Sequence, residues 1–115
     1  MPTPTPSDFS DLAGRAADAA GLLKLLANER RLLILCHLAG AGELSVGALA
    51  DLVGLSQSAL SQHLALMRQQ GLVAFRRDGQ TLHYAIHDPA AARFLAMLKD
   101  IYCGGANRQE GPKLS

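Results

Sequence analysis

Residues 43–73 read ELSVGALADLVGLSQSALSQHLALMRQQGLV, and they are the most informative segment of the chain about its fold. Its apolar residues recur at helical spacing in two runs, which predicts a short helix over residues 46–53 and a second over residues 57–70. A glycine, a leucine and a serine separate the runs at positions 54–56, and serine is a preferred N-cap residue. The pattern therefore predicts two short helices joined by a tight turn, which is typical of a helix-turn-helix unit.

The second helix of this unit has an apolar side and a polar side. Leu60, Leu64 and Met67 form the apolar side. The polar side, near the helix N-terminus, holds short or planar hydrogen-bonding groups and no carboxylate, which is the chemistry that base edges and phosphates require. Polar groups of this kind can also lie on a helix face only because that face is exposed to water. Because the whole set lies on the second helix of a turn-linked pair, it predicts DNA recognition. The predicted contacts on this helix are Ser56, Gln57, Ser58, Ser61, Gln62 and His63.

After residue 71 the spacing of apolar residues changes from helical to alternating. Two alternating runs, at 73–75 and 82–86, lie on either side of the pair Asp78-Gly79. This pair tolerates the positive φ angles of a two-residue hairpin turn. Counting outward from it predicts a hairpin in which Phe75 faces Leu82 and all the apolar residues share one side.

A hairpin that directly follows a recognition helix is typical of a wing that contacts the DNA backbone or the minor groove. Arg76, Arg77 and Gln80 at its tip are the predicted wing contacts, although arginine is also ordinary on a solvent-exposed strand. Arg68, near the end of the preceding helix, either contacts phosphate or balances the helix dipole. Residues 55–87 hold three arginines against one aspartate, in a chain of formal net charge +1, so positive charge gathers where a DNA surface needs it.

Three further helices are predicted around this unit. The first runs from an N-cap at Ser7 to about residue 27, the second from residue 29 to about residue 39, and the last from Pro89 to about residue 103. The predicted fold class is mainly α with a small β-hairpin, a winged helix-turn-helix of five helices plus the wing. We expect one DNA-binding and dimerisation domain over residues 8–103, between disordered tails at 1–7 and 104–115.

Composition argues against several classes of function. The chain has 115 residues, of which 49% are hydrophobic, but no apolar stretch is long enough to span a bilayer. Its Pro/Thr-rich start lacks the basic and apolar segments of a secretory signal, so we expect a cytoplasmic location without membrane contact. The sequence shows no nucleophile–base–acid set, no glycine-rich phosphate loop, no metal triad and no C-x-x-C pair. It therefore predicts neither an enzyme nor a bound cofactor.

The order of these elements resembles the ArsR family of winged-helix transcriptional repressors. The matching stretches are LLKLLANERRLLILCHL at 22–38, the segment 43–73 quoted above and RRDGQTLHYAI at 76–86. The resemblance implies a repressor that binds double-stranded operator DNA and releases it in response to an inducer. It also implies a homodimer built from the first and last helices, and a single short recognition helix needs a second copy for specificity.

The metal-binding patterns of this family are missing at the matching positions. One type places thiols in an ELCVC pattern, but this chain reads ELSVG there, and Ser45 and Gly47 do not bind soft metals. A second type uses aspartate and histidine pairs on the last helix, where this chain has Asp100 and no histidine. His83 and His87 lie four residues apart on one strand face, but two ligands make a poor site. No metal site is predicted.

Thiol chemistry remains as a means of sensing. Cys36 lies in the predicted second helix, and Cys103 closes the last helix. Free cysteine is often simply buried, but a cysteine at a helix end has no obvious packing role. This pair, in these two helices, resembles the persulfide-sensing branch of the family. The resemblance implies that reactive sulfur species join Cys36 and Cys103 in an intrasubunit disulfide or polysulfide link, which lowers DNA affinity.

Two alternatives remain open at this point. A repressor of the same fold could sense a thiophilic metal, haem or general oxidants through the same cysteines. A winged-helix module could instead serve only protein contact, in which case it would show no salt-dependent DNA binding.

Overall fold

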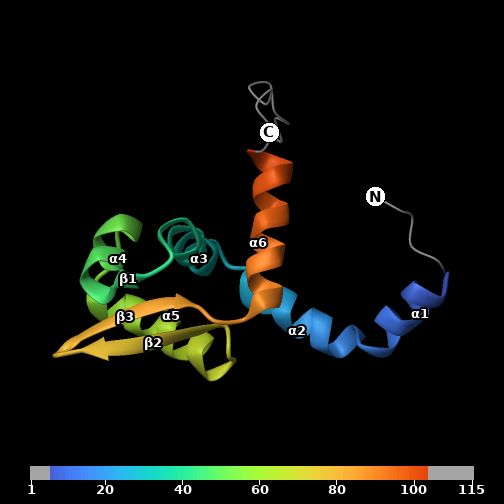
Figure 1. The fold of residues 1–115 in the computed structure, drawn as a ribbon, viewed down its shortest axis with the longest axis horizontal. Coiled ribbons are helices and arrows are strands. Elements are labelled where there is room, and N and C mark those ends of the chain that lie inside the picture. Colours follow the sequence, from blue (N-terminus) through green and yellow to red (C-terminus); the bar gives the residue numbers. More distant parts are fainter. Residues whose placement is uncertain (1–5, 104–115) are drawn as a thin grey trace.

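The computed structural model describes residues 6–103 of the chain. Along these residues the elements are α1 (Pro6–Gly14), α2 (Ala16–Leu26), α3 (Glu29–Ala41), β1 (Leu44–Ser45), α4 (Val46–Val53), α5 (Gln57–Gln69), β2 (Val73–Asp78), β3 (Thr81–Ile86) and α6 (Pro89–Tyr102). In Figure 1, α3, α4, α5 and the sheet gather on one side of α6, while α2 and α1 run out on the other. The architecture confirms the predicted class, mainly α with a small hairpin.

Local capping chemistry explains where four of the helices begin. The side chains of Asn28, Ser45, Ser56 and Asp88 each accept a hydrogen bond from a backbone N–H in the first turn of α3, α4, α5 and α6. Each cap satisfies one of the N–H groups that a helix start leaves without a partner. Between α4 and α5 the chain turns through Gly54, whose φ of +71° is a conformation that favours glycine.

The predicted first helix is wrong in one respect, because the structure has two helices there. α1 ends at Gly14, and the Arg15 N–H donates to the Leu12 carbonyl at 2.9 Å, which closes a tighter turn than an α-helix uses. Glycine is among the weakest helix formers, so the break falls beside it. α1 begins at Pro6, so the last two residues of the predicted 1–7 tail are helical. Residues 1–5 and the predicted tail 104–115 lie outside the described residues.

The hairpin forms, but its predicted register is wrong. Phe75 pairs with Tyr84 rather than Leu82, and the turn is Gly79-Gln80 rather than Asp78-Gly79. Gly79 has a φ of +65°, as the first central residue of a type II′ turn requires. The error shifts the partner by two residues, and side chains alternate with a period of two. The apolar residues therefore share a face in either register, and alternation alone cannot distinguish them.

A third strand was not predicted. β1 contains two residues and pairs antiparallel with β3, so the strand order is β1-β3-β2. Leu44 lies opposite Tyr84, and Ser45 lies opposite His83. Two residues are too few to show an alternating pattern in the sequence. The strand forms because its backbone pairs with the edge of β3 that β2 leaves unpaired. It ties the segment before α4 to the hairpin.

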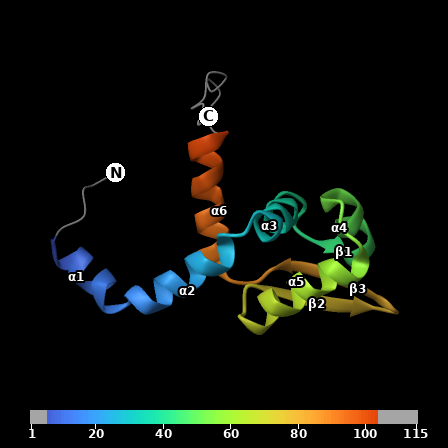
Figure 2. The ribbon, with the colours of Figure 1, turned by 180° about the vertical axis from the view of Figure 1, so that it is seen from behind.

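One hydrophobic core holds these elements together. It is formed by buried residues of α2, α3, α4, α5, the hairpin and α6, and the largest fully buried side chains are Ile34, Leu35, Leu38, Leu49, Leu60, Leu64, Met67, Leu72 and Val73. The predicted apolar side of α5 faces inward, as expected. α1 contributes nothing to this core and extends away from it together with much of α2 (Figure 2). Within residues 6–103, every helix is too short or too polar to span a bilayer.

Candidate nucleic-acid interface and thiol pair

The polar side of α5 faces outward. Ser56, Gln57, Ser58, Ser61 and Gln62 are exposed, and His63 is half-buried, while the apolar side is packed against the core. α4 packs across α5 on the inner side, and β2 lies beside it. The N-terminal half of α5 therefore presents hydrogen-bonding groups and the positive end of a helix dipole to solvent. This is the geometry that groove recognition by a helix requires.

Ser56 has a structural role in addition to its place on this face. Its Oγ accepts a hydrogen bond from the Ala59 N–H at 3.1 Å and caps α5. The hydroxyl proton remains available to a phosphate oxygen, so a cap and a DNA contact are compatible. Gln57 leans toward α4, because its Nε2 lies 3.8 Å from the point where a side chain on Gly47 would begin.

Replacing Ser56 with alanine is expected to lower the free energy of unfolding by about 1 kcal/mol, because the first turn of α5 loses its cap. The matched control is Ser58→Ala, which removes an equally exposed hydroxyl without a hydrogen bond to the described part of the chain. Urea denaturation measures both variants. Equal losses of stability in the two would contradict a capping role for Ser56.

The three arginines predicted to contact DNA lie in different environments. Arg76 donates to the Glu43 carboxylate through both Nε and Nη2, each at 2.9 Å. The Arg68 guanidinium lies over the ring of Phe75, 5.4 Å from its centroid, and that ring contacts Tyr84. Arg77 makes no ion pair within residues 6–103. Of the predicted cations, Arg77 is therefore the one most available to a phosphate.

The partner of Arg76 was missed by the sequence reasoning. Glu43 lies 33 residues before Arg76 and has no periodic or motif relation to it. The hydrogen bond from Arg76 lowers the pKa of the Glu43 carboxyl below its usual value, and the same bond raises the pKa of Arg76. Both groups therefore stay ionised throughout the physiological range.

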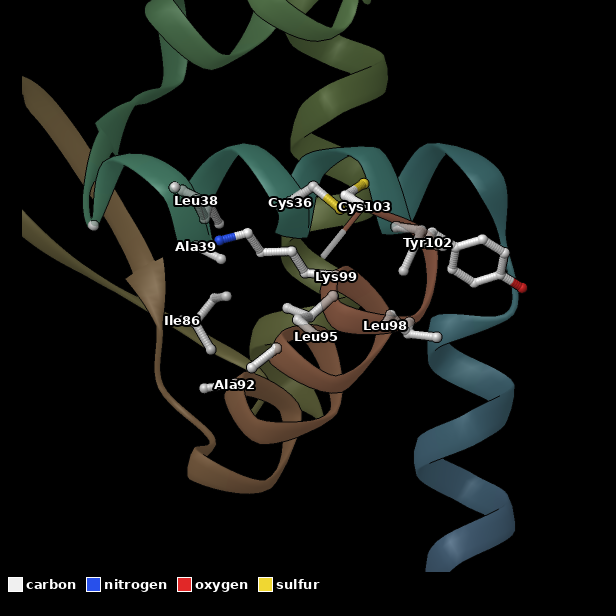
Figure 3. Close-up of a pocket in the computed structure, with 14 residues that line it drawn as sticks. Cys36, Leu38, Ala39, Ile86, Ala92, Leu95, Leu98, Lys99, Tyr102 and Cys103 are labelled. Carbon is white, nitrogen blue, oxygen red and sulfur yellow. The ribbon is translucent and has the colours of Figure 1, made fainter. Parts of the chain in front are cut away.

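The two cysteines lie together although they are far apart in the sequence. Cys36 is on α3, Cys103 is the C-cap of α6, and both are exposed free thiols. Figure 3 shows the two sulfur atoms beside each other at one end of a cavity. Burial against the neighbouring side chains raises the pKa of the Cys36 thiol, and the proximity of Cys103 raises it further. Both cysteines also line this same cavity, so they are neighbours in the fold although they are 67 residues apart in the sequence.

The cavity beside these thiols lies between α3 and α6 and has a volume of about 1040 Å³. Its walls are mainly aliphatic, with side chains such as Leu38, Ile86 and Leu95, and Lys99 and Tyr102 lie on its α6 side (Figure 3). It is open to solvent, so a small molecule can reach both thiols.

His83 and His87 gain no further metal-ligating partner, because the described residues contain no cluster of three metal-ligating side chains.

The helix-turn-helix of α4 and α5, followed by the β2–β3 hairpin, defines a class of protein. The chain is a DNA-binding transcriptional regulator of the winged helix-turn-helix class. Residues 28–74 match the family model described as bacterial regulatory protein, arsR family.

Comparison with known proteins agrees with this match. The chain is 44% identical to the HTH-type transcriptional regulator YgaV of Escherichia coli, over 84% of this chain and 98% of that protein. The structure of reduced HlyU from Vibrio cholerae superposes with a TM-score of 0.76 at 46% identity, covering 82% of this chain and 98% of the other. The transcriptional repressor BigR from Xylella fastidiosa gives a TM-score of 0.76 at 36% identity, covering 84% and 97%. This chain belongs to the arsR family of bacterial regulatory proteins.

Proposed function

We propose that this regulator is a homodimeric repressor that binds operator DNA and releases it when reactive sulfur species link Cys36 to Cys103. The observation that carries the proposal is the meeting of the two thiols beside one open cavity, between a core helix and the last helix. The chain has only two cysteines. Because both lie at one site on separate helices, a covalent link between them would join two structural units.

The DNA contacts are proposed on the outward side of α5 and on the wing. On α5 and its N-cap they are Ser56, Gln57, Ser58, Ser61, Gln62, His63 and Arg68, and on the wing they are Arg76, Arg77 and Gln80. The exposed, carboxylate-free surface of α5 supports base and phosphate contacts there. Arg68 and Arg76 already have partners within the protein, so each can bind a phosphate only if its guanidinium moves away from that partner.

The proposed dimer interface uses the first and last helices. Among the described residues, six of the ten exposed large apolar side chains lie on α1, α2 and α6: Phe9, Leu12, Leu23, Met97, Ile101 and Tyr102. α1 packs against α2 and is otherwise remote from the core. A second copy of the chain would bury these side chains. It would also place the two copies of α5 about one DNA turn apart, so that each enters one of two successive major grooves.

The sulfur chemistry balances with two thiolates and one persulfide, R–S–SH. One cysteine thiolate attacks the terminal sulfur and expels RS⁻, so that it becomes a cysteine persulfide. The second thiolate attacks the Sγ atom of the first cysteine and expels the outer sulfur as HS⁻, which leaves a Cys36–Cys103 disulfide. A polysulfide link requires a second persulfide molecule, whose terminal sulfur is transferred to the cysteine persulfide with loss of RS⁻. Attack of the other thiolate on the central sulfur then expels HS⁻ and leaves a trisulfide.

The link would couple the thiols to the DNA surface through α6. Cys103 ends α6, whose exposed side forms part of the proposed dimer interface, while Cys36 lies on α3 against the core that supports α4 and α5. Drawing the end of α6 onto α3 therefore changes how one helix-turn-helix unit sits relative to the other in the dimer. Allosteric coupling of this kind changes affinity by about 5-fold to 150-fold.

The test is binding to the promoter DNA upstream of the protein's own gene. It compares reduced protein, protein treated with an organic persulfide, and the variants Cys36→Ser and Cys103→Ser. We expect persulfide to weaken binding of the native chain by at least about tenfold and to leave both variants unaffected. Mass spectrometry should find a cross-linked peptide that contains both cysteines.

Each other outcome has a distinct meaning. Unmodified thiols with unchanged DNA binding would overturn persulfide sensing. Release by a thiophilic metal, haem or a general oxidant, without release by persulfide, would assign a different inducer to the same thiols. Absence of salt-dependent binding to any duplex would favour a module for protein contact.

A further inference from the structure

The Glu43–Arg76 ion pair joins the two outer strands of the sheet. Glu43 directly precedes β1, and Arg76 lies in β2. Between them on β3 is His83, which pairs with Arg76 on one side and with Ser45 on the other. The two side chains therefore meet over the face of the sheet that carries His83. Both are substantially exposed, at 57% for Arg76 and 39% for Glu43.

The neighbouring arginine points the other way. Successive side chains on a strand alternate between faces, so Arg77 shares its face with Phe75 and not with Arg76. Phe75 is the ring on which Arg68 of α5 rests, so this face is the one turned toward the recognition helix. The adjacent arginines Arg76 and Arg77 thus have different surroundings, and the charge of Arg76 is already balanced by the Glu43 carboxylate.

The charge at the wing follows from this arrangement. Arg76 and Arg77 are balanced by Asp78 and Glu43, so the tip and its partner carry no net charge. A carboxylate that accepts two parallel hydrogen bonds from a guanidinium fork offers the same contacts as two oxygens of a phosphate. Glu43 and a DNA phosphate therefore compete for the same donors, Nε and Nη2 of Arg76.

We propose that Glu43 is an internal competitor with DNA phosphate for Arg76, and that it limits the non-specific DNA affinity of the wing. The inference rests on the proposed DNA binding and adds a residue that sets its strength. In the free protein Arg76 is held against Glu43, and Arg77 is the wing arginine without an ion pair among the described residues. A phosphate can bind Arg76 only by displacing a carboxylate that then stays nearby and repels it.

Removing the competitor should strengthen binding. Glu43→Gln keeps the size of the side chain and removes its charge. We expect it to tighten binding to random-sequence duplex DNA, and for each added phosphate contact the gain should be about threefold larger at ~50 mM than at ~200 mM salt. The slope of log affinity against log salt should become steeper by about 0.9 per contact. Fluorescence anisotropy over a salt series, with the full chain, measures both quantities.

Four companion variants make the test specific. Glu29→Gln removes the same charge from an exposed position in the first turn of α3, and it reports the effect of net charge alone. Glu43→Gln combined with Arg76→Gln should abolish the gain, because the freed donor is absent. Arg77→Gln in the native background should reduce the salt slope by about 0.9 for each subunit bound, whereas Arg76→Gln should change it little.

The outcomes separate this inference from the proposed function. If the native chain binds duplex DNA with a salt-dependent affinity but Glu43→Gln binds no more tightly than Glu29→Gln, the competition is refuted. Weaker binding by Glu43→Gln, with an unchanged melting temperature, would refute it as well and would make Glu43 a residue that positions the wing. If the native chain binds no duplex, both proposals fail together.

Discussion

Replacing Gln62 with glutamate is expected to weaken duplex binding by about 100-fold or more while the fold stays intact. Gln62 is exposed on the outward side of α5, in the half of the helix that is proposed to enter the groove. A carboxylate there loses the amide donor and brings a negative charge close to phosphates, and like charges brought together at an interface cost several kcal/mol. The measurement is fluorescence anisotropy with operator DNA at a fixed salt concentration.

The matched control for this variant is Gln69→Glu. It makes the same chemical change on the same helix, seven residues or about 10 Å further along the axis. Binding should fall much less for Gln69→Glu, and circular dichroism should show both variants folded. If the two variants bind equally well, the N-terminal half of α5 does not lie in the groove, and the proposed contacts on this helix are wrong.

Truncating Leu64 to alanine is expected to remove about 2–5 kcal/mol from the free energy of unfolding. Leu64 is 1% exposed and anchors the middle of α5 to the core. The truncation loses the burial of the leucine side chain and leaves a cavity that the neighbours fill only in part. A typical domain is stable by about 5–15 kcal/mol, so the loss is a large fraction of the total.

The same helix supplies the control for this second variant. Leu66→Ala makes an identical truncation at a side chain that is 37% exposed, and we expect a loss of about 1 kcal/mol or less. Urea denaturation at one fixed protomer concentration compares the two, since dimerisation makes apparent stability depend on concentration. Similar losses at the two positions would mean that α5 does not pack on the core through the side that carries Leu64.

Much of the fold could be predicted because it depends on neighbours in the chain. A cap such as Ser56 and the N–H that it binds are three residues apart, and the apolar side of α5 repeats every three or four residues. The break at Arg15 was missed because the glycine beside it weakens a helix without specifying where the chain turns. The hairpin register was missed because two registers bury the same side chains.

The candidate site divides in the same way. The polar side of α5 was predicted residue by residue, and the structure exposes Gln57, Ser58 and Gln62 as expected. The sequence alone treated Arg76 and Arg77 alike, whereas the fold gives one of them a carboxylate partner and leaves the other without an ion pair among the described residues. The meeting of Cys36 and Cys103 was implied only by resemblance, since no local pattern connects them.

Local sequence patterns specify the helix-turn-helix, its capped ends, its outward polar side and the existence of the hairpin. The hairpin register, the added strand β1, the Glu43–Arg76 pair and the shared cavity of the two thiols depend on how distant segments pack together. The reason is the range of the interactions. Caps and periodic faces depend on residues within about four positions, whereas these contacts join segments that meet only after the core has brought them together.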